Sequence, residues 1–293
     1  MTVTEMLPLW RSSLFVPATS ERFIAKAHLR GADAIKIDLE DAVAPTEKAR
    51  ARTLVPAVAA SVGQAGADVL VRINRPWRMA VADLEASVGA DVNGIVIPKI
   101  ESADHVVFLE EIVAELEAER GLAPGHTCFT LQIETAKGFL NVREIAGASR
   151  RNKAISVGNE DFAHMLGMPE TISEALIGAM QTVQMAAREA GILALGYPGS
   201  IANFSDLDAY RADIARARAL GFDGGSCIHP AQVAILNEGF APTAVEIAEA
   251  EGIIAAYDAA LARGEGAVAY QGKMIDIPIA ARARRTLAQR DRI

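Results

Sequence analysis

The sequence lacks the features that define several protein classes. Only two cysteines, Cys128 and Cys227, occur in 293 residues, which is too few for a disulfide framework or a cysteine-based metal site. We expect both to be buried, reduced thiols. No apolar stretch approaches the roughly 20 residues that a membrane-spanning helix needs, and the opening residues MTVTEMLPLWRSS have neither the basic start nor the apolar core of a signal peptide. These absences predict a cytoplasmic protein with no membrane partner.

Basic residues are also scarce. The chain has 29 Lys and Arg against 37 Asp and Glu, a net charge of −8, and no long basic run, which argues against nucleic acid and anionic membranes as partners. The loop after the first apolar run reads PATSERF, so the glycine-rich fingerprint of a dinucleotide fold is missing. What remains is a composition, 51% hydrophobic and 23% charged, that suits a globular protein with a sizeable core.

Eight short apolar runs alternate with longer amphipathic segments. The runs are residues 13–17, 34–38, 69–74, 94–99, 128–134, 154–158, 192–196 and 226–230. Their spacing is near the roughly 30 residues of one strand plus one crossover helix. Eight such units in succession predict an α/β fold, a (β/α)8 TIM barrel. An open doubly wound sheet is the alternative.

The last part of the chain is surplus to eight such units. We therefore expect a barrel over residues 1–240 and a C-terminal helical extension with a lid segment over residues 241–293. Thr243 and Glu246 have the spacing of a capping box, which predicts a helix to about Leu261. The remainder has a Gly-Lys turn, then Asp276 and a basic amphipathic tail. Such a tail serves packing, an oligomer contact or a lid over a barrel mouth.

Polar side chains follow the central runs, where a barrel enzyme carries its chemistry. They are Asp38, Glu40, Asp41, Arg72, Asn74, Lys99, Glu134, Glu160 and Asp161. Carboxylates at neighbouring strand ends, Glu134 and the Glu160–Asp161 pair, would repel by about 4 kcal/mol at 4 Å and an effective dielectric near 20. A divalent cation between them removes that cost. Oxygen ligands without a His or Cys cluster favour Mg²⁺, or Mn²⁺, over zinc.

Seven segments, in this order, resemble the citrate lyase beta-subunit branch of the HpcH/HpaI aldolase superfamily. They are the stretch 11–52 with its DLEDAV motif, VLVRIN (69–74), IPKIESADHV (97–106), IET (133–135), GNEDFAHMLG (158–167), CIHPAQV (227–233) and GKMIDIP (272–278). The resemblance extends from Arg11 to about Leu287. It implies a Mg²⁺-dependent TIM barrel that cleaves or forms a carbon–carbon bond next to a thioester.

The resemblance also implies roles for single residues. Glu134 of IET and Asp161 of the GNED segment would be the protein ligands of Mg²⁺ and would hold the substrate through it, with water and substrate completing the shell. Arg72 of VRIN would bind the substrate's carboxylate or the developing enolate oxygen, a task that suits the planar guanidinium. Glu40 and Asp41 would hold Arg72 and the metal-bound waters.

By the same resemblance, Asp276 would be the acid/base that a neighbouring subunit brings over the barrel mouth, which implies a homo-oligomer, a trimer or hexamer. Two positions depart from the family pattern, because Gly225 stands where relatives often have Lys, and Gly196 where they have Asp.

Three functions remain open. The first is a lyase for a short 3-hydroxyacyl-CoA of malyl or citramalyl type, which yields acetyl-CoA and a 2-oxoacid. The second is an aldolase that acts on free pyruvate or other 2-oxoacids. The third is a subunit of citrate lyase beta type that works only with an acyl-carrier protein.

Overall fold

The computed structural model describes residues 7–168 and 173–293, and the chain divides into two compact units, Met1–Gly239 and Phe240–Ile293. The first unit contains an eight-stranded parallel sheet in the order β7-β6-β5-β4-β3-β2-β1-β8. Its strands are β1 (Ser12–Pro17), β2 (Ala34–Asp38), β3 (Asp68–Arg72), β4 (Gly94–Ile97), β5 (Cys128–Ile133), β6 (Asn152–Val157), β7 (Leu193–Leu195) and β8 (Gly225–Cys227).

The sheet closes on itself between β7 and β8. Leu195 and Gly224 form a single parallel bridge. Two further hydrogen bonds run from the Gly196 amide to Gly224 O at 2.8 Å and from the Asp223 amide to Ala194 O at 2.9 Å. The predicted (β/α)8 barrel is therefore confirmed, and an open doubly wound sheet is ruled out.

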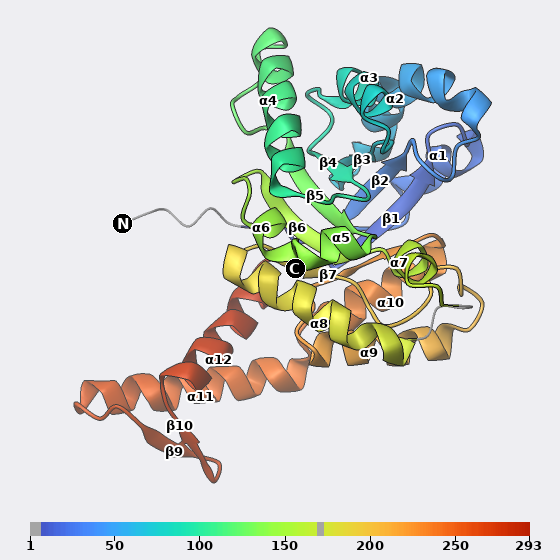
Figure 1. Cartoon of the computed structure of the whole chain (residues 1–293). Coiled ribbons are helices and arrows are strands. Elements are labelled where there is room, and N and C mark those ends of the chain that lie inside the picture. The colour runs from blue at the N-terminus through green and yellow to red at the C-terminus, as the bar shows by residue number, and fades with distance from the viewer. Residues whose placement is uncertain (1–6, 169–172) are drawn as a thin grey trace. The chain divides into compact units, whose positions relative to one another are not determined.

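Helices follow the strands and surround the barrel (Figure 1). They are α1 (Glu21–Ala27), α2 (Lys48–Gly63) with the short 3-10 turn η1 (Pro45–Glu47) before it, α3 (Trp77–Ser87), α4 (Ala103–Glu119), α5 (Ala136–Leu140), α6 (Val142–Ala146), α7 (Asn159–Met165), α8 (Ser173–Ala190), α9 (Leu207–Ala219) and α10 (Pro230–Phe240). On α4, Leu109, Val113 and Leu116 are buried, as expected of an i, i+4, i+7 apolar stripe.

Alternate residues of each strand point into the barrel. An apolar cluster fills the interior near the strand starts, built from Trp10, Ala34, Leu70, Val96, Ala154, Leu193 and Leu195. Polar side chains occupy the following inward positions, because Lys36 and Asp38 come next after Ala34 on the same face of β2. The interior is thus apolar at the strand starts and charged toward the strand ends.

The second unit contains two helices and a hairpin. They are α11 (Ala244–Ala262), β9 (Val268–Tyr270), β10 (Lys273–Ile275) and α12 (Ile277–Arg290). The predicted capping box of Thr243 and Glu246 is present. The antiparallel hairpin was not predicted. Its turn residues, Gln271 and Gly272, have positive φ angles of 49° and 76°, which are typical of a tight hairpin turn.

Two expectations from the composition concern membrane-spanning helices and the cysteines. Among the described residues, no helix combines the length and apolar character that spanning a bilayer requires. Both cysteines are thiols, and Cys227 is buried as expected, but the expectation for Cys128 was wrong because it is only partly buried.

Candidate active site

The ends of β2 and β3 join an aspartate to an arginine. Asp38 and Arg72 are paired in register, and the guanidinium donates from Nε and Nη2 to the two Asp38 oxygens, each at 2.7 Å. Asp38 also accepts the backbone N–H groups of Glu40 and Ala42. Burial opposes the charged form, but the hydrogen bonds and charge of Arg72 outweigh it and lower the pKa of Asp38. The guanidinium lies 4.7 Å from the centre of the Phe15 ring.

Glu40 and Asp41 both face Arg72, at different distances. The Arg72 Nη1 lies 3.1 Å from Glu40 Oε2 and 3.9 Å from Asp41 Oδ2, and the Asp41 side chain is 60% exposed. The two-point contact with Asp38 is the closest of the three, so Asp38 is the principal partner of Arg72. Sequence reasoning noted Asp38 at the strand end but gave it no role, because three acidic residues in DLED compete for one arginine.

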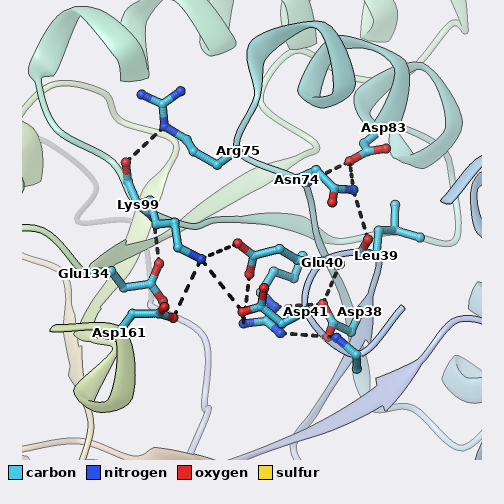
Figure 2. A network of polar contacts seen from close by, with 12 residues as sticks. Asp38, Leu39, Glu40, Asp41, Asn74, Arg75, Asp83, Lys99, Glu134 and Asp161 are labelled. Carbon is cyan, nitrogen blue, oxygen red and sulfur yellow. Dashed lines mark hydrogen bonds and ion pairs between the residues drawn. The ribbon is translucent and has the colours of Figure 1, made fainter. Parts of the chain in front are cut away.

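Asn74, which follows β3, has a structural role. Its side-chain amide donates to Leu39 O at 2.9 Å and to Asp83 Oδ2 at 2.7 Å (Figure 2). These bonds tie the chain after β2 to the chain after β3, and so hold the loops that carry Glu40 and Arg75 in place.

Lys99 follows β4 and connects the carboxylates on either side of it (Figure 2). Its backbone N–H donates to Glu134 Oε2 at 2.8 Å, and its Nζ lies 2.7 Å from Glu40 Oε1 and 3.7 Å from Asp161 Oδ2. Burial works against its charge, but Glu40, Glu134 and Asp161 together raise the pKa of Lys99. Its φ angle is +50°, a conformation that costs a non-glycine residue about 1–3 kcal/mol. The fold sustains this strain in a residue whose backbone and side chain both serve the site.

Glu134 and Asp161 come from adjacent strands. Glu134 directly follows β5 and is 2% exposed, whereas Asp161 lies in the first turn of α7, after β6, and is more open. A Cβ atom at Gly158 would overlap the Glu134 carboxyl group, so the position of that carboxyl group requires glycine at residue 158. Burial, with the nearby charge of Glu40, raises the pKa of Glu134 to about 8. A cation beside this carboxyl would favour its charged form.

These residues fit a Mg²⁺ ion. Glu134 and Asp161 offer oxygen ligands, and the glycine at position 158 cradles one of them. Among the described residues, no group of three or more His, Cys, Asp and Glu side chains is arranged to hold a metal. Glu134 and Asp161 therefore stay the ligands that we predict for the ion.

Arg72, Glu134 and Asp161 line a cavity of about 830 Å³. Residues from many strands line it, including Phe15, Asp38, Asp41, Arg72, Gln132, Glu134, Ser156, Asp161, Tyr197, Phe204, Ser226 and His229. Three exposed cations, Arg22, Lys26 and Arg30, line it from α1 and the residues after it. Sequence reasoning missed them, although their spacing of four residues, typical of one helix face, was a usable signal.

Two glycines of the β7–β8 side are explained by local geometry. Gly196 has a φ angle of +142°, which side chains rarely adopt. A Cβ at Gly225 would lie 3.0 Å from the Tyr197 ring, and the Tyr197 hydroxyl donates to Ser226 O at 3.1 Å. Tyr197 therefore occupies the space that a side chain at position 225 would need.

Asp276 lies in the second unit, at the N-cap of α12. Its carboxylate accepts the Ile279 N–H at 3.4 Å. This contact holds the side chain at the junction between the hairpin and the last helix.

Comparison with known proteins agrees with the geometry. A family model described as HpcH/HpaI aldolase/citrate lyase matches residues 11–230. The citrate lyase subunit beta of Leuconostoc mesenteroides subsp. cremoris is 35% identical over 283 residues, covering 95% of this chain and 92% of its own length. The L-malyl-CoA/beta-methylmalyl-CoA lyase of Cereibacter sphaeroides is 36% identical over 289 residues, with 91% and 90% covered. The crystal structure of the CitE protein of Mycobacterium tuberculosis with magnesium, acetoacetate and coenzyme A has a TM-score of 0.72 at 29% identity, with 95% of this chain and 97% of that chain covered.

Proposed function

Since the chain belongs to the HpcH/HpaI aldolase/citrate lyase family, we propose that it is a Mg²⁺-dependent carbon–carbon lyase. It cleaves a short 3-hydroxyacyl-CoA, such as malyl-CoA or citramalyl-CoA, into acetyl-CoA and a 2-oxoacid, or forms the ester from these two compounds. The observation that carries this proposal is the convergence of Glu134, Asp161 and Arg72 in one cavity. Two carboxylates suited to Mg²⁺ and a guanidinium suited to a carboxylate match the two ends of a 2-oxoacid.

The cleavage is a retro-Claisen reaction. The 3-hydroxyl gives its proton to solvent, and its oxygen becomes the carbonyl oxygen of the 2-oxoacid. The bond between C2 and C3 of the thioester breaks, and its electron pair passes to the departing acetyl thioester as an enolate. Mg²⁺, when bound by Glu134 and Asp161, supplies Lewis-acid polarisation to the oxygens of the 2-oxoacid. Arg72, held in one orientation by Asp38, stabilises the negative charge that develops.

The enolate carbon then needs a proton. Asp276 would deliver it, or remove it in the synthetic direction, from the C-terminal segment of a neighbouring subunit. The proposal therefore includes a homo-oligomer, a trimer or hexamer, in which each site is completed by another copy of the chain.

The thioester end of the substrate also has matching charges. Coenzyme A carries a diphosphate and a 3′-phosphate, and Arg22, Lys26 and Arg30 line the cavity as exposed cations. Arginine and lysine are the usual partners of phosphate groups. This cluster supports a CoA ester over a free acid as the substrate.

A coupled assay tests the proposal. Purified protein with Mg²⁺ is given malyl-CoA, methylmalyl-CoA and citramalyl-CoA in turn, and released glyoxylate or pyruvate is measured. We expect product from at least one ester and its loss with EDTA. Protein that binds Mg²⁺ and a 2-oxoacid but cleaves none of the esters would overturn the CoA-lyase function.

The same assay separates the alternatives. Turnover of a free hydroxyacid that yields pyruvate without CoA would identify an aldolase. The match to a citrate lyase subunit beta over 95% of the chain supports the other alternative, a carrier-dependent subunit. Activity that appears only after addition of an acyl-carrier protein would select it.

A further inference from the structure

Arg75 follows β3 and supports the backbone of Lys99. Its Nε donates to the Lys99 carbonyl oxygen at 3.1 Å (Figure 2). The guanidinium is itself constrained, because its Cζ lies 4.0 Å from the centre of the Trp77 ring and its Nη2 lies 3.9 Å from Glu101 Oε2. A guanidinium over an aromatic face is held there by cation–π attraction. Arg75 therefore reaches Lys99 from a fixed direction.

The Trp77 ring is fixed in turn by aromatic side chains of α4. His105 and Phe108 contact it edge-on, with ring centres 4.8 Å and 5.8 Å from its own. Edge-to-face pairs at these separations are favourable. The support for Arg75 thus comes from α3 and α4, in the helix layer around the barrel.

Lys99 benefits from this support because its backbone is strained. Its φ angle of +50° lies in the left-handed region, which a residue with a Cβ atom avoids. In this conformation the Lys99 N–H donates to Glu134 Oε2 at 2.8 Å, and the following amide, of Ile100, donates to Gln132 O at 3.4 Å. Relaxation to a negative φ angle would rotate the N–H of Lys99 relative to its carbonyl group. With the carbonyl held by Arg75, such a rotation would take the N–H away from Glu134.

The orientation of the Glu134 carboxyl group therefore depends on Arg75 through Lys99. Glu134 is one of the two carboxylates that we assign to Mg²⁺, and substitution of residues that orient a metal ligand typically lowers metal affinity 10- to 100-fold. The charge of Arg75 has the opposite effect, because a nearby cation repels Mg²⁺. Removal of Arg75 should weaken Mg²⁺ binding if its positioning role dominates and strengthen it if only its charge matters.

We propose that Arg75 is a positioning residue, which holds Lys99 in its left-handed conformation and so directs the Lys99 N–H at Glu134. The expected effect on Mg²⁺ rests on the proposed function, since it takes Glu134 as a ligand of the ion. The expected effect on the backbone is independent of that function, because it concerns only the hydrogen bond between Lys99 and Glu134.

Two measurements on full-length Arg75→Met test the proposal. Hydrogen–deuterium exchange of the metal-free protein, read on peptic peptides that contain Lys99, should be roughly 5- to 10-fold faster at that amide than in the wild type, the effect of losing one hydrogen bond. Isothermal titration should show Mg²⁺ affinity weakened roughly 10-fold. Wild-type exchange at Lys99, or Mg²⁺ binding that is unchanged or tighter, would overturn the proposal.

Arg78→Met is the matched control. Arg78 is an exposed arginine on α3, so this substitution removes the same charge three positions along the chain. We expect exchange at Lys99 to stay at the wild-type rate and Mg²⁺ binding not to weaken. Weaker Mg²⁺ binding in Arg78→Met would overturn the assignment of the effect to Arg75.

A second variant, Trp77→Leu, keeps Arg75 but removes the ring beside its guanidinium. It should shift both measurements in the same directions as Arg75→Met, by about 2- to 5-fold, as for loss of a cation–π contact. If Arg75→Met does not fold, wild-type values in Trp77→Leu would overturn the proposal. Wild-type protein that does not bind Mg²⁺ would refute the proposed function, whereas faster exchange at Lys99 in Arg75→Met would still support the role of Arg75.

Discussion

The barrel encloses two cations, Arg72 and Lys36, that lie over the same Phe15 ring and differ in their partners. Arg72 is bound at two points by Asp38 and contacted by Glu40. Lys36 donates one hydrogen bond, to the hydroxyl of Ser226. We call Asp38, Glu40, Arg72, Lys99, Glu134 and Asp161 the rim group. The rim group is internally paired, so its geometry is set before substrate arrives, whereas Lys36 has no carboxylate partner among the described residues.

The largest expected effect comes from the rim group. Glu134→Gln keeps the shape of the side chain but removes a charge that would bind the metal, and we expect at least a 1000-fold fall in kcat/KM, the several kcal/mol that metal polarisation provides. Steady-state kinetics and Mg²⁺ titration check this. Glu189→Gln, at an exposed ion pair with Arg143, is the control for loss of one negative charge. Unchanged Mg²⁺ affinity in Glu134→Gln would remove Glu134 from the ligand set.

Arg72→Lys keeps the charge of the rim group and removes its planar geometry. An ammonium cannot hold Asp38 at two points and also face the substrate, so we expect roughly a 100-fold loss of kcat/KM, the scale of one preorganised donor. Kinetic constants for both the thioester and the 2-oxoacid provide the measurement. Near-normal kinetics would show that the paired geometry of the rim group is unnecessary for catalysis.

Asp276→Asn tests whether catalysis by the rim group requires the carboxylate of Asp276. We expect Mg²⁺ and 2-oxoacid binding to stay within about 2-fold while carbon proton transfer slows by roughly 100-fold, as for loss of a general acid/base. Deuterium incorporation into the methyl group of acetyl-CoA, followed by NMR, reports this step. An exchange rate equal to that of the wild type would reduce the C-terminal segment to a packing role.

The smallest expected effect is on the free energy of unfolding, to which Lys36 contributes differently from Arg72. Burial, followed by the charge of Arg72 and opposed by Cys227, lowers the pKa of Lys36 to about 7, while an unfolded lysine titrates near 10.4. Between these values the unfolded chain binds more protons than the folded chain, so Lys36 makes the wild type less stable as the pH falls. Lys36→Met should therefore be more stable than the wild type by about 1–3 kcal/mol at pH 7.

Urea unfolding of both proteins at several pH values checks this sign. The advantage of Lys36→Met should shrink as the pH rises from 7 toward 10. A variant that is less stable than the wild type at pH 7 would show that Lys36 is stabilised by the folded state.

The barrel was predictable from sequence because each strand is an apolar run of about the right length, and parallel strands are buried on both faces. Because both faces of such a strand are buried, the sequence pattern does not show which side chains point into the barrel. AIKID reads as a strand throughout, but only the register with β1 and β3 shows that Lys36 points inward with Asp38. A polar residue within such a run is therefore the hardest part of a site to interpret from sequence.

Pairing between strand ends was also beyond the sequence. DLED offers three acids, and the choice of Asp38 as the main partner of Arg72 depends on the register of β2 and β3. The role of Lys99 depends on a positive φ angle that no residue type in IPK indicates. Repulsion between the strand-end carboxylates was the reason to predict a divalent cation there. The structure shows that Lys99 places one positive charge against Glu40 and near Asp161.

Barrel closure between β7 and β8 affects how the molecule fluctuates. These strands have three residues each, and one bridge joins them. Local opening requires the least free energy where the fewest hydrogen bonds are shared, so we expect transient opening to concentrate at this seam, beside Ser226. The strands beside Arg72 and Glu134 share longer ladders, since β3 pairs with β2, and β5 with β6, over five residues each. Flexibility at the seam and rigidity at the strand ends beside Arg72 and Glu134 are thereby expected in different sectors of one barrel wall.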